Sequence, residues 1–391
     1  MKKIGIVSCY FQKNYGSMLQ AFATQEAIIK LGYEAETICI DGIIKEIRNA
    51  KLKYYAKQLF NWSIVKGKLG FITRFFIKKI DKDFKMNLII RDEKFIEFKN
   101  SKYKLSDRCN SKQELGIYCK KYSSVLVGSD QLWLPSNIDA DYYTLNFVPE
   151  TVNKIAYSTS FGVSSLPKRQ WNFANKFLNR INYISVREES GKKIIKDIAN
   201  RDVSVVCDPT LLFTKDEWLN YFPNKKLFDG KYIFCYFLGN NPKQRKFANR
   251  VRDITGYKIV SLLHMDEYVK SDINFPDYAP YNIGPEEFIN LIRNAEYIIT
   301  DSFHGTVFSV LNGKEFFTFR RFKEGSTLST NSRMHSLFNL LDLHERFITS
   351  EQDVTKALNL KIDYKKVWNK IENYRQNSYQ YLKVALEGGS K

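Results

Sequence analysis

Apolar and polar positions alternate along the chain in a pattern that predicts short buried strands followed by helices. Residues 4–9 form an apolar run typical of a buried strand, and a polar loop at 12–17 leads into a helical pattern over 18–31. Gly32 stands at the C-cap position of that helix, and 36–40 is the next predicted strand. This order of elements favours an α/β fold.

The same rhythm returns further along the chain. Apolar runs typical of strands fall at 124–127, 154–158, 181–186, 203–207, 232–238, 258–263, 297–300 and 316–319. A largely polar stretch at 224–230 separates two α/β halves. We therefore expect two Rossmann-like, doubly wound domains over 1–225 and 226–350, with helices over 351–391 that pack back across both.

Residues 43–100 form a segment of different character that is inserted in the first half. Between 45 and 85 there are 12 Lys or Arg and three acidic residues, interleaved with aromatic side chains. The segment predicts one or two basic amphipathic helices. Three roles remain open for it: a solvated face packed on the protein, a surface for anionic lipid headgroups, or a nucleic-acid contact that no recognised motif accompanies.

The composition is that of a folded protein with an excess of positive charge. The 391 residues include 61 Lys or Arg and 42 Asp or Glu, for a net charge of +19, while 44% are apolar, which excludes a disordered chain. Uninterrupted apolar runs stay short of 18 residues, and the amino terminus lacks a signal-peptide pattern, so we expect a soluble protein. Six scattered cysteines indicate reduced core thiols and a cytoplasmic location.

Polar or charged clusters follow several of the predicted strands. They lie at 14–17, 128–131, 187–190, Asp208 and 301–305. Ligands of open parallel sheets bind beyond the carboxyl ends of the strands, so these loops are predicted to line one crevice.

The loop at 301–305 carries the most specific chemistry. Asp301 or Ser302 can cap the following helix, whose free N–H groups would attract a phosphate or carboxylate. His304 is the one histidine of four at such a junction, and it is a candidate general acid or base. A capping or buried structural histidine is the alternative.

Cations for an anionic ligand follow in the sequence. Arg187 ends an apolar strand, where its charge needs a partner. The further candidates are Arg320, Arg321, Lys323 and Arg333, because arginine matches phosphate and carboxylate groups well.

Five motifs together resemble the polysaccharide pyruvyl transferase family. They are NYGS at 14–17, VGSDQLW at 127–133, SVRE at 185–188, CDPT at 207–210 and ITDSFHG at 299–305. The resemblance spans roughly residues 1–345 and belongs to a branch with the DSFHG form. Many members have an arginine where this chain has Ser302.

The resemblance implies a GT-B-like pair of Rossmann-type domains, with the acceptor on the first and phosphoenolpyruvate on the second. It also implies a bacterial, cytoplasmic enzyme of exopolysaccharide or capsule biosynthesis in the cell envelope. The pyruvyl group of phosphoenolpyruvate would become a cyclic ketal on a sugar, nucleotide- or polyprenyl-linked, with no cofactor and no metal. The enzyme could also contact the membrane surface.

The implied site residues divide by role. His304 and Arg187 would be catalytic. Phosphoenolpyruvate would be bound by Ser302, Gly305, Arg320, Arg321, Lys323 and Arg333. The acceptor would be bound by Asn14, Tyr15, Gly16, Gly128, Ser129, Asp130, Gln131 and Asp208, of which the two aspartates could orient or deprotonate it, or cap loops.

Two other functions remain open. One is a GT-B-type glycosyltransferase that uses a nucleotide sugar, and the other is a non-catalytic protein that binds anions or a membrane surface. About half of the excess charge lies at 45–85, remote in sequence from the candidate site, where we expect a contact for a lipid-linked acceptor rather than for nucleic acid.

Overall fold

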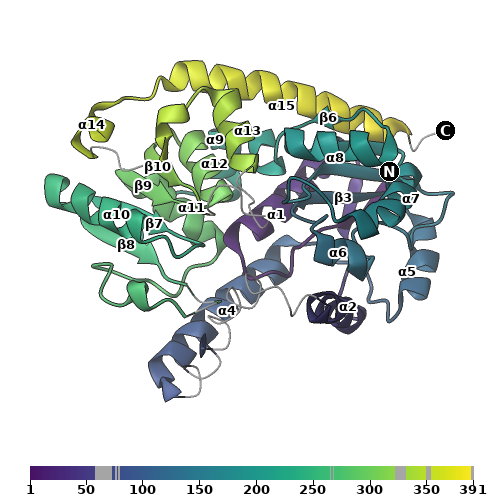
Figure 1. The fold of residues 1–391 in the computed structure, drawn as a ribbon, viewed down its shortest axis with the longest axis horizontal. Helices are drawn as coiled ribbons and strands as arrows, with labels where there is room; N and C mark the ends of the chain where they lie inside the picture. Colours follow the sequence, from purple (N-terminus) through teal and green to yellow (C-terminus); the bar gives the residue numbers. More distant parts are fainter. Residues whose placement is uncertain are drawn as a thin grey trace.

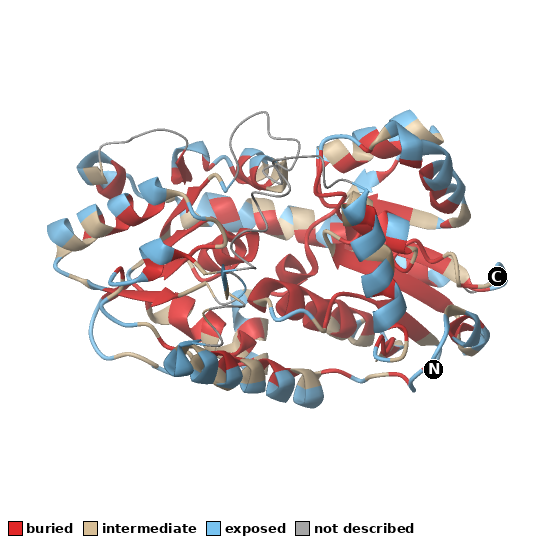
Figure 2. Cartoon of the chain, turned by 60° about the horizontal axis from the view of Figure 1, so that its bottom comes forward, coloured by how far each residue is buried: buried red, intermediate tan, exposed pale blue. Residues whose placement is uncertain are grey.

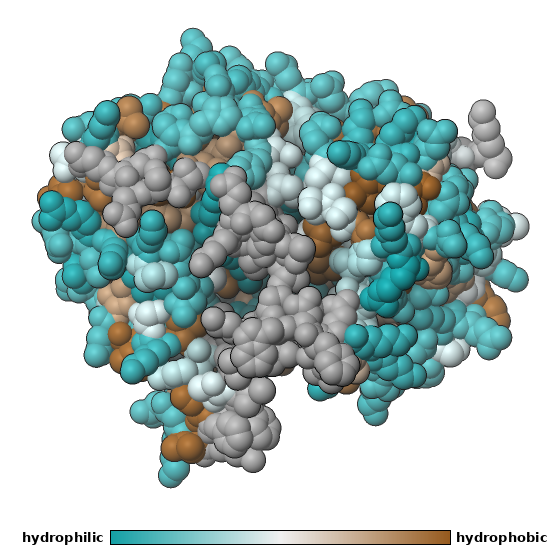
Figure 3. Space-filling view, in the orientation of Figure 1, coloured by the Kyte–Doolittle hydropathy of each residue, from teal (hydrophilic) through white to brown (hydrophobic). Residues whose placement is uncertain are grey.

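Two parallel sheets lie side by side in the computed structural model, and helices flank each of them (Figure 1). The structure describes residues 1–57, 73–74, 77, 80–264, 266, 268–321, 332–348 and 354–388. Figure 2 shows the buried residues gathered along the strands and the inner faces of the helices. In the view of Figure 3, hydrophilic residues cover most of the surface.

The first sheet has the strand order β2-β1-β3-β4-β5-β6, and all its pairings are parallel. Its strands are β1 (Lys3–Val7), β2 (Glu34–Thr37), β3 (Ser124–Asp130), β4 (Asn153–Thr159), β5 (Tyr183–Val186) and β6 (Ser204–Val205). The helices along this part of the chain are α1 (Tyr15–Lys30), α2 (Ile44–Ala56), α4 (Lys82–Lys102), α5 (Lys112–Tyr118), α6 (Pro135–Ala140), α7 (Trp171–Arg180), α8 (Glu189–Ala199) and α9 (Lys215–Tyr221).

The second sheet has the order β11-β10-β9-β7-β8 and is also parallel throughout. Its strands are β7 (Tyr232–Tyr236), β8 (Lys258–Leu262), β9 (Tyr297–Thr300), β10 (Glu315–Phe319) and β11 (Phe347–Ile348). The helices here are α10 (Pro242–Thr255), α11 (Pro285–Asn294), α12 (Phe303–Leu311), α13 (Ser332–Leu341), α14 (Val354–Asn359) and α15 (Tyr364–Glu387). The predicted α/β class with two Rossmann-like sheets is confirmed.

The second strand differs from the predicted 36–40 and ends at Thr37. The N–H of Cys39 donates to Ser106 Oγ at 2.9 Å, and the N–H of Ile40 donates to Tyr10 Oη at 3.1 Å. These backbone groups are bonded to side chains, so the ladder stops although the residues stay buried.

Each sheet has one point where the strand order reverses. In the first sheet it lies between β1 and β3, and in the second it lies between β7 and β9. Ligands of doubly wound sheets bind at such points, beyond the carboxyl ends of the strands. The loops that leave β3 and β9 therefore lie where a ligand is expected to bind.

The segment at 43–100 contributes α2 and α4. Helix α2 packs against α6 of the first domain, and α4 reaches α11 of the second, where Lys94 Nζ lies 3.8 Å from Glu287 Oε1. Figure 1 shows α4 extending outward from the body of the molecule. The predicted boundary near 225 falls in the loop between α9 and β7.

Helix α15 runs along one side of the whole molecule (Figure 1). It contacts α13, which lies between β10 and β11 of the second sheet in the chain, and it also contacts β4 of the first sheet. Arg375 Nε donates to the Leu211 carbonyl at 2.7 Å, and Ser378 Oγ accepts a hydrogen bond from the Cys207 N–H at 2.9 Å. Helix α15 thus completes the hydrogen bonding of the loop at 207–211, which comes much earlier in the chain.

The two sheets share a packed interface. One continuous cluster of buried apolar side chains includes residues from both sheets. At its centre Tyr15 stacks on Phe288, with ring centroids 4.9 Å apart, and its hydroxyl donates to the Ile283 carbonyl at 3.2 Å. Tyr15, predicted to bind the acceptor, therefore lies in the interface between the domains.

Candidate functional site

The two reversal points face each other across a cavity of about 240 Å³. Residues from both domains line it, and we call it the interdomain cavity. Seven of the predicted site residues are among them: Asn14, Asp130, Gln131, Ser302, His304, Arg321 and Arg333. Residues as far apart in the sequence as Asn14 and Arg333 thus form one site, as expected for strands that end at facing sheet edges.

The start of α12 forms one wall of this cavity. Ser302 is the N-cap residue, and its hydroxyl accepts a hydrogen bond from the Gly305 N–H at 3.2 Å. Asp301 does not cap the helix. Its carboxylate instead accepts hydrogen bonds from the N–H groups of Leu238 and Gly239, at 2.6 and 2.9 Å, which fixes the loop after β7.

His304 lies in the first turn of α12, with its side chain 7% exposed. Gly16, at the start of α1, packs directly against the imidazole: a Cβ added to Gly16 would lie 2.0 Å from His304 Nδ1. The predicted acceptor-binding loop therefore positions the histidine of the opposite domain, and only glycine permits this approach.

Asp208 is the buried carboxylate nearest to His304. Its Oδ2 lies 3.6 Å from His304 Nε2 and accepts a hydrogen bond from Arg187 Nη1 at 2.7 Å. Its Oδ1 accepts from the N–H and the hydroxyl of Thr210, at 3.0 and 2.7 Å. Burial alone would raise the pKa of Asp208, but His304, Arg187 and Thr210 outweigh it and hold the pKa far below its ordinary value.

Asp130, at the end of β3, is equally constrained. Its carboxylate accepts a hydrogen bond from Ser17 Oγ at 2.7 Å and lies 3.2 Å from Arg187 Nη2 and 3.5 Å from Arg333 Nη1. Although burial opposes ionisation, Arg187, His304 and Arg333 keep the pKa of Asp130 well below its ordinary value. A carboxylate with so low a pKa is a weak proton acceptor, so this geometry favours orienting roles for both aspartates.

Arginine side chains flank the ring of Phe303. The Arg187 guanidinium lies 4.7 Å from the ring centroid and that of Arg333 lies 5.5 Å from it. Burial beside Arg187 lowers the pKa of Arg333 to about 10, so it remains charged at neutral pH in a place where an added anion would stabilise it.

A second cavity of about 720 Å³ adjoins the first. Phe303 and Arg333 line both, so they form the partition, and Arg187 and Asp208 line only the second. Both predicted catalytic residues are thus buried beside Asp208, but only His304 faces the interdomain cavity.

The other predicted site residues that the structure describes do not line the interdomain cavity. Gly128 lies against the backbone of Tyr157, and Ser129 donates its hydroxyl to the Ser158 carbonyl at 2.8 Å. Gly305 is buried within α12. The Arg320 guanidinium lies 5.7 Å from the Phe347 ring centroid, while Lys323 lies outside the described residues.

Several lining residues were not foreseen from the sequence. Lys51 and Tyr55 come from α2, and Ser136 and Asn137 come from α6. The 45–85 segment is remote in sequence from the candidate site, but α2 brings two of its residues to the cavity. The sequence offers one signal for this contribution of α2: Lys51 and Tyr55 are four residues apart, which places both side chains on one face of a helix.

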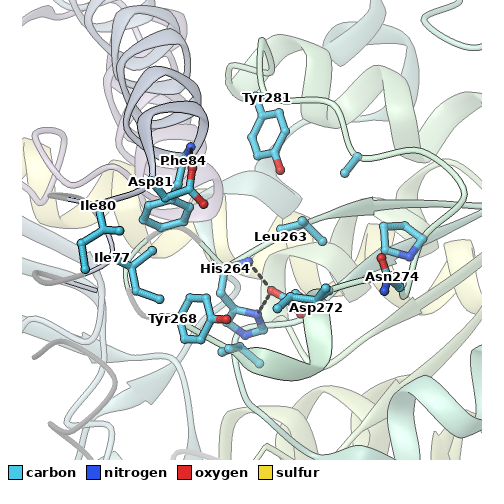
Figure 4. Close-up of a pocket in the computed structure, with 14 residues that line it drawn as sticks. Ile77, Ile80, Asp81, Phe84, Leu263, His264, Tyr268, Asp272, Asn274 and Tyr281 are labelled. Atoms are coloured by element: carbon cyan, nitrogen blue, oxygen red, sulfur yellow. Dashed lines mark hydrogen bonds and ion pairs between the residues drawn. The ribbon is translucent and has the colours of Figure 1, made fainter. Parts of the chain in front are cut away.

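A third cavity, of about 560 Å³, lies between α4 and the loops that follow β8, and no predicted site residue lines it (Figure 4). His264 Nδ1 lies 2.9 Å from Asp272 Oδ2, and Arg245 pairs with the same carboxylate. These buried contacts of Asp272 tie the loop after β8 to α10. Phe84 and Tyr281 contribute aromatic side chains to the walls.

Among the described residues, the six cysteines are free and buried, as predicted. No described helix is long and apolar enough to cross a bilayer. The described part of the chain likewise brings no three His, Cys, Asp or Glu side chains into a group suited to a metal ion.

A model of the polysaccharide pyruvyl transferase family matches residues 14–321. This range covers most of the chain and includes Asn14, Arg187, His304 and Arg321. No curated protein matches.

Solved structures with a related fold include UDP-GlcNAc 2-epimerase from Methanocaldococcus jannaschii, at 13% identity and a TM-score of 0.47, with 93% of each chain covered. A putative UDP-N-acetylglucosamine 2-epimerase from Listeria monocytogenes is 8% identical, with a TM-score of 0.48 and coverage of 98% of this chain and 91% of that chain. The wall teichoic acid polymerase TagF is 13% identical, with a TM-score of 0.46 and coverage of 99% and 88%.

The contact between Gly16 and His304 predicts a strong energetic coupling. Gly16→Ala should lower the apparent free energy of unfolding by about 2 kcal/mol, because the new methyl group overlaps the imidazole. In a His304→Ala background the same change should cost much less, since the space is vacant. Urea denaturation of the four proteins measures the coupling, and equal costs in both backgrounds would contradict the contact.

Asp208→Asn should destabilise the protein by about 3 kcal/mol at neutral pH, because it leaves the buried Arg187 short of a counterion. The folded pKa of Asp208 is depressed, so its contribution is complete above the unfolded value of about 3.9 and is lost as pH falls below it. The difference in the free energy of unfolding between wild type and variant should therefore become smaller as the pH is lowered. Denaturation measured at intervals from pH 7 to pH 3.5 follows this difference. A difference that grows on acidification would exclude an ionised Asp208.

Proposed function

The chain belongs to the polysaccharide pyruvyl transferase family, and on this basis we propose that it transfers the pyruvyl group of phosphoenolpyruvate to a sugar, forming a cyclic ketal and releasing phosphate. The observation that carries the proposal is the placement of His304 at a helix start, on the same cavity wall as Ser302, Arg321 and Arg333. A phosphate and a carboxylate need such a set of cations and helix N–H groups.

The first chemical step is protonation of the methylene carbon of phosphoenolpyruvate. We assign the transfer of this proton to His304, whose Nε2 lies 3.6 Å from Asp208 Oδ2. Protonation makes the methylene a methyl group and leaves an oxocarbenium-like centre at C2. Arg321 and Arg333 stabilise the negative charge of the phosphate group through this step.

A sugar hydroxyl then attacks C2 and gives up its proton, which replaces the one lost by His304. The C2–O bond to phosphate breaks with its electron pair going to phosphate, and a second hydroxyl closes the ketal. The proton of this second hydroxyl leaves with the phosphate. One phosphoenolpyruvate and one diol thus give one ketal and one phosphate, with no oxidant or cofactor.

In this proposal Arg187 acts through other residues. Its guanidinium is engaged by Asp130 and Asp208, at 3.2 and 2.7 Å, and it lies outside the interdomain cavity. We therefore assign it a positioning role that keeps both carboxylates ionised. Asp130 and the amides of Asn14 and Gln131 then orient the acceptor hydroxyls.

Neighbouring arginines offer a matched test of the donor site. Phosphoenolpyruvate should raise the melting temperature of the wild type and of Arg320→Ala, and the rise should be largely lost in Arg321→Ala, because only Arg321 lines the interdomain cavity. Thermal shift over a phosphoenolpyruvate titration measures this. An equal loss of this stabilisation in Arg320→Ala and Arg321→Ala would contradict the placement of phosphoenolpyruvate in the interdomain cavity.

His304→Asn should reduce phosphate release from phosphoenolpyruvate by at least about 100-fold with sugar acceptors, because the proton donor is missing. His344→Asn, at an exposed position, should leave turnover unchanged. Turnover of a nucleotide sugar by the wild type without phosphoenolpyruvate would instead support the glycosyltransferase alternative.

Contact of the basic segment with a membrane surface stays a prediction.

A further inference from the structure

Lys51 projects from α2 onto the interdomain cavity, from a segment that the family motifs leave out. Ile47 and Tyr54 of the same helix are buried, while Lys51 and Tyr55 line the cavity. The Tyr55 hydroxyl donates to Ser136 Oγ at 3.3 Å, which fixes this face of α2 against α6.

The Lys51 ammonium has no ion pair or hydrogen bond with any residue that the structure describes. Asp130, the one carboxylate among the described residues that line the cavity, is already engaged by Ser17, Arg187 and Arg333. Burial lowers the pKa of Lys51 below its ordinary value. Burying an ammonium that has no counterion among the described residues costs free energy, and an anion bound in the cavity beside Lys51 would offset this cost.

The position of Lys51 distinguishes this anion from the donor. Arg321, Arg333 and the start of α12 stand on the second-domain wall and suffice for a phosphate and a carboxylate. Lys51 stands on the first-domain wall instead. Its neighbours in the lining there are Gln12, Asn14, Gln131 and Asn137, whose amides are suited to hydrogen bonds with sugar hydroxyls.

We propose that Lys51 binds an anionic group of the acceptor, a phosphate ester or a carboxylate, close to the hydroxyls that receive the pyruvyl group. The inference rests on the proposed function, and it narrows the acceptor to negatively charged sugars. It also gives α2 a role in selecting the substrate.

The test uses small anions, so that no particular sugar has to fit. With phosphoenolpyruvate saturating, methyl phosphate and acetate are titrated separately against the wild type, Lys51→Met and Lys53→Met, with the melting temperature as the readout. Lys53 is exposed on the same helix, so Lys53→Met removes an equal charge outside the cavity.

At least one of the two anions should further stabilise the wild type and Lys53→Met, and whichever does so identifies the group as a phosphate ester or a carboxylate. Its half-maximal concentration should rise at least tenfold in Lys51→Met, while the stabilisation by phosphoenolpyruvate alone should be unchanged.

Equal responses of Lys51→Met and Lys53→Met to the anions would overturn the inference, and so would no response in the wild type. A comparable loss of the response to phosphoenolpyruvate in Lys51→Met would place Lys51 in the donor site and overturn it as well. Failure of phosphoenolpyruvate to stabilise even the wild type would count against the proposed function instead, and the same titrations without it would then still report whether Lys51 binds anions.

Discussion

The buried bonds of Arg187 to Asp130 and Asp208 are the constraint on which the site depends. A guanidinium that is 2% exposed cannot remain there without counterions, and each of the two carboxylates needs the arginine in return. The bonds hold the loop after β3 to the loop after β6. They place two negative charges beside His304, which comes from the other domain.

Much of the site could be predicted because a parallel sheet gathers its loops at one edge. Asn14 caps the helix that follows β1, Asp130 ends β3 and His304 lies in the first helical turn after β9, and the structure brings all three to one cavity. The same rule does not say which way a side chain points. Arg320 and Arg321 are adjacent at the end of β10, and only the second lines the cavity, since successive residues of an extended chain face opposite sides.

Contacts between segments that are distant in the chain could not be predicted from the sequence. Tyr15 belongs to the predicted acceptor loop, but it stacks on Phe288 in the domain interface. Lys51 belongs to a basic segment for which the sequence leaves open a solvated face, a lipid contact or a nucleic-acid contact, and it reaches the cavity because α2 packs on α6. Both outcomes depend on how helices from separate parts of the chain pack together. The periodicity of one helix predicts which of its faces is buried, but not which other helix that face packs against.

Helix α15 has a consequence for how the protein is made. The Cys207 N–H and the Leu211 carbonyl belong to the first domain, but their hydrogen-bond partners, Ser378 and Arg375, follow them by 171 and 164 residues in the chain. A nascent chain with its first sheet assembled would hold these groups unsatisfied until the carboxy-terminal helix leaves the ribosome. The loop that carries Asp208 therefore reaches its final packing only after α15 has been synthesised and has docked on the first domain.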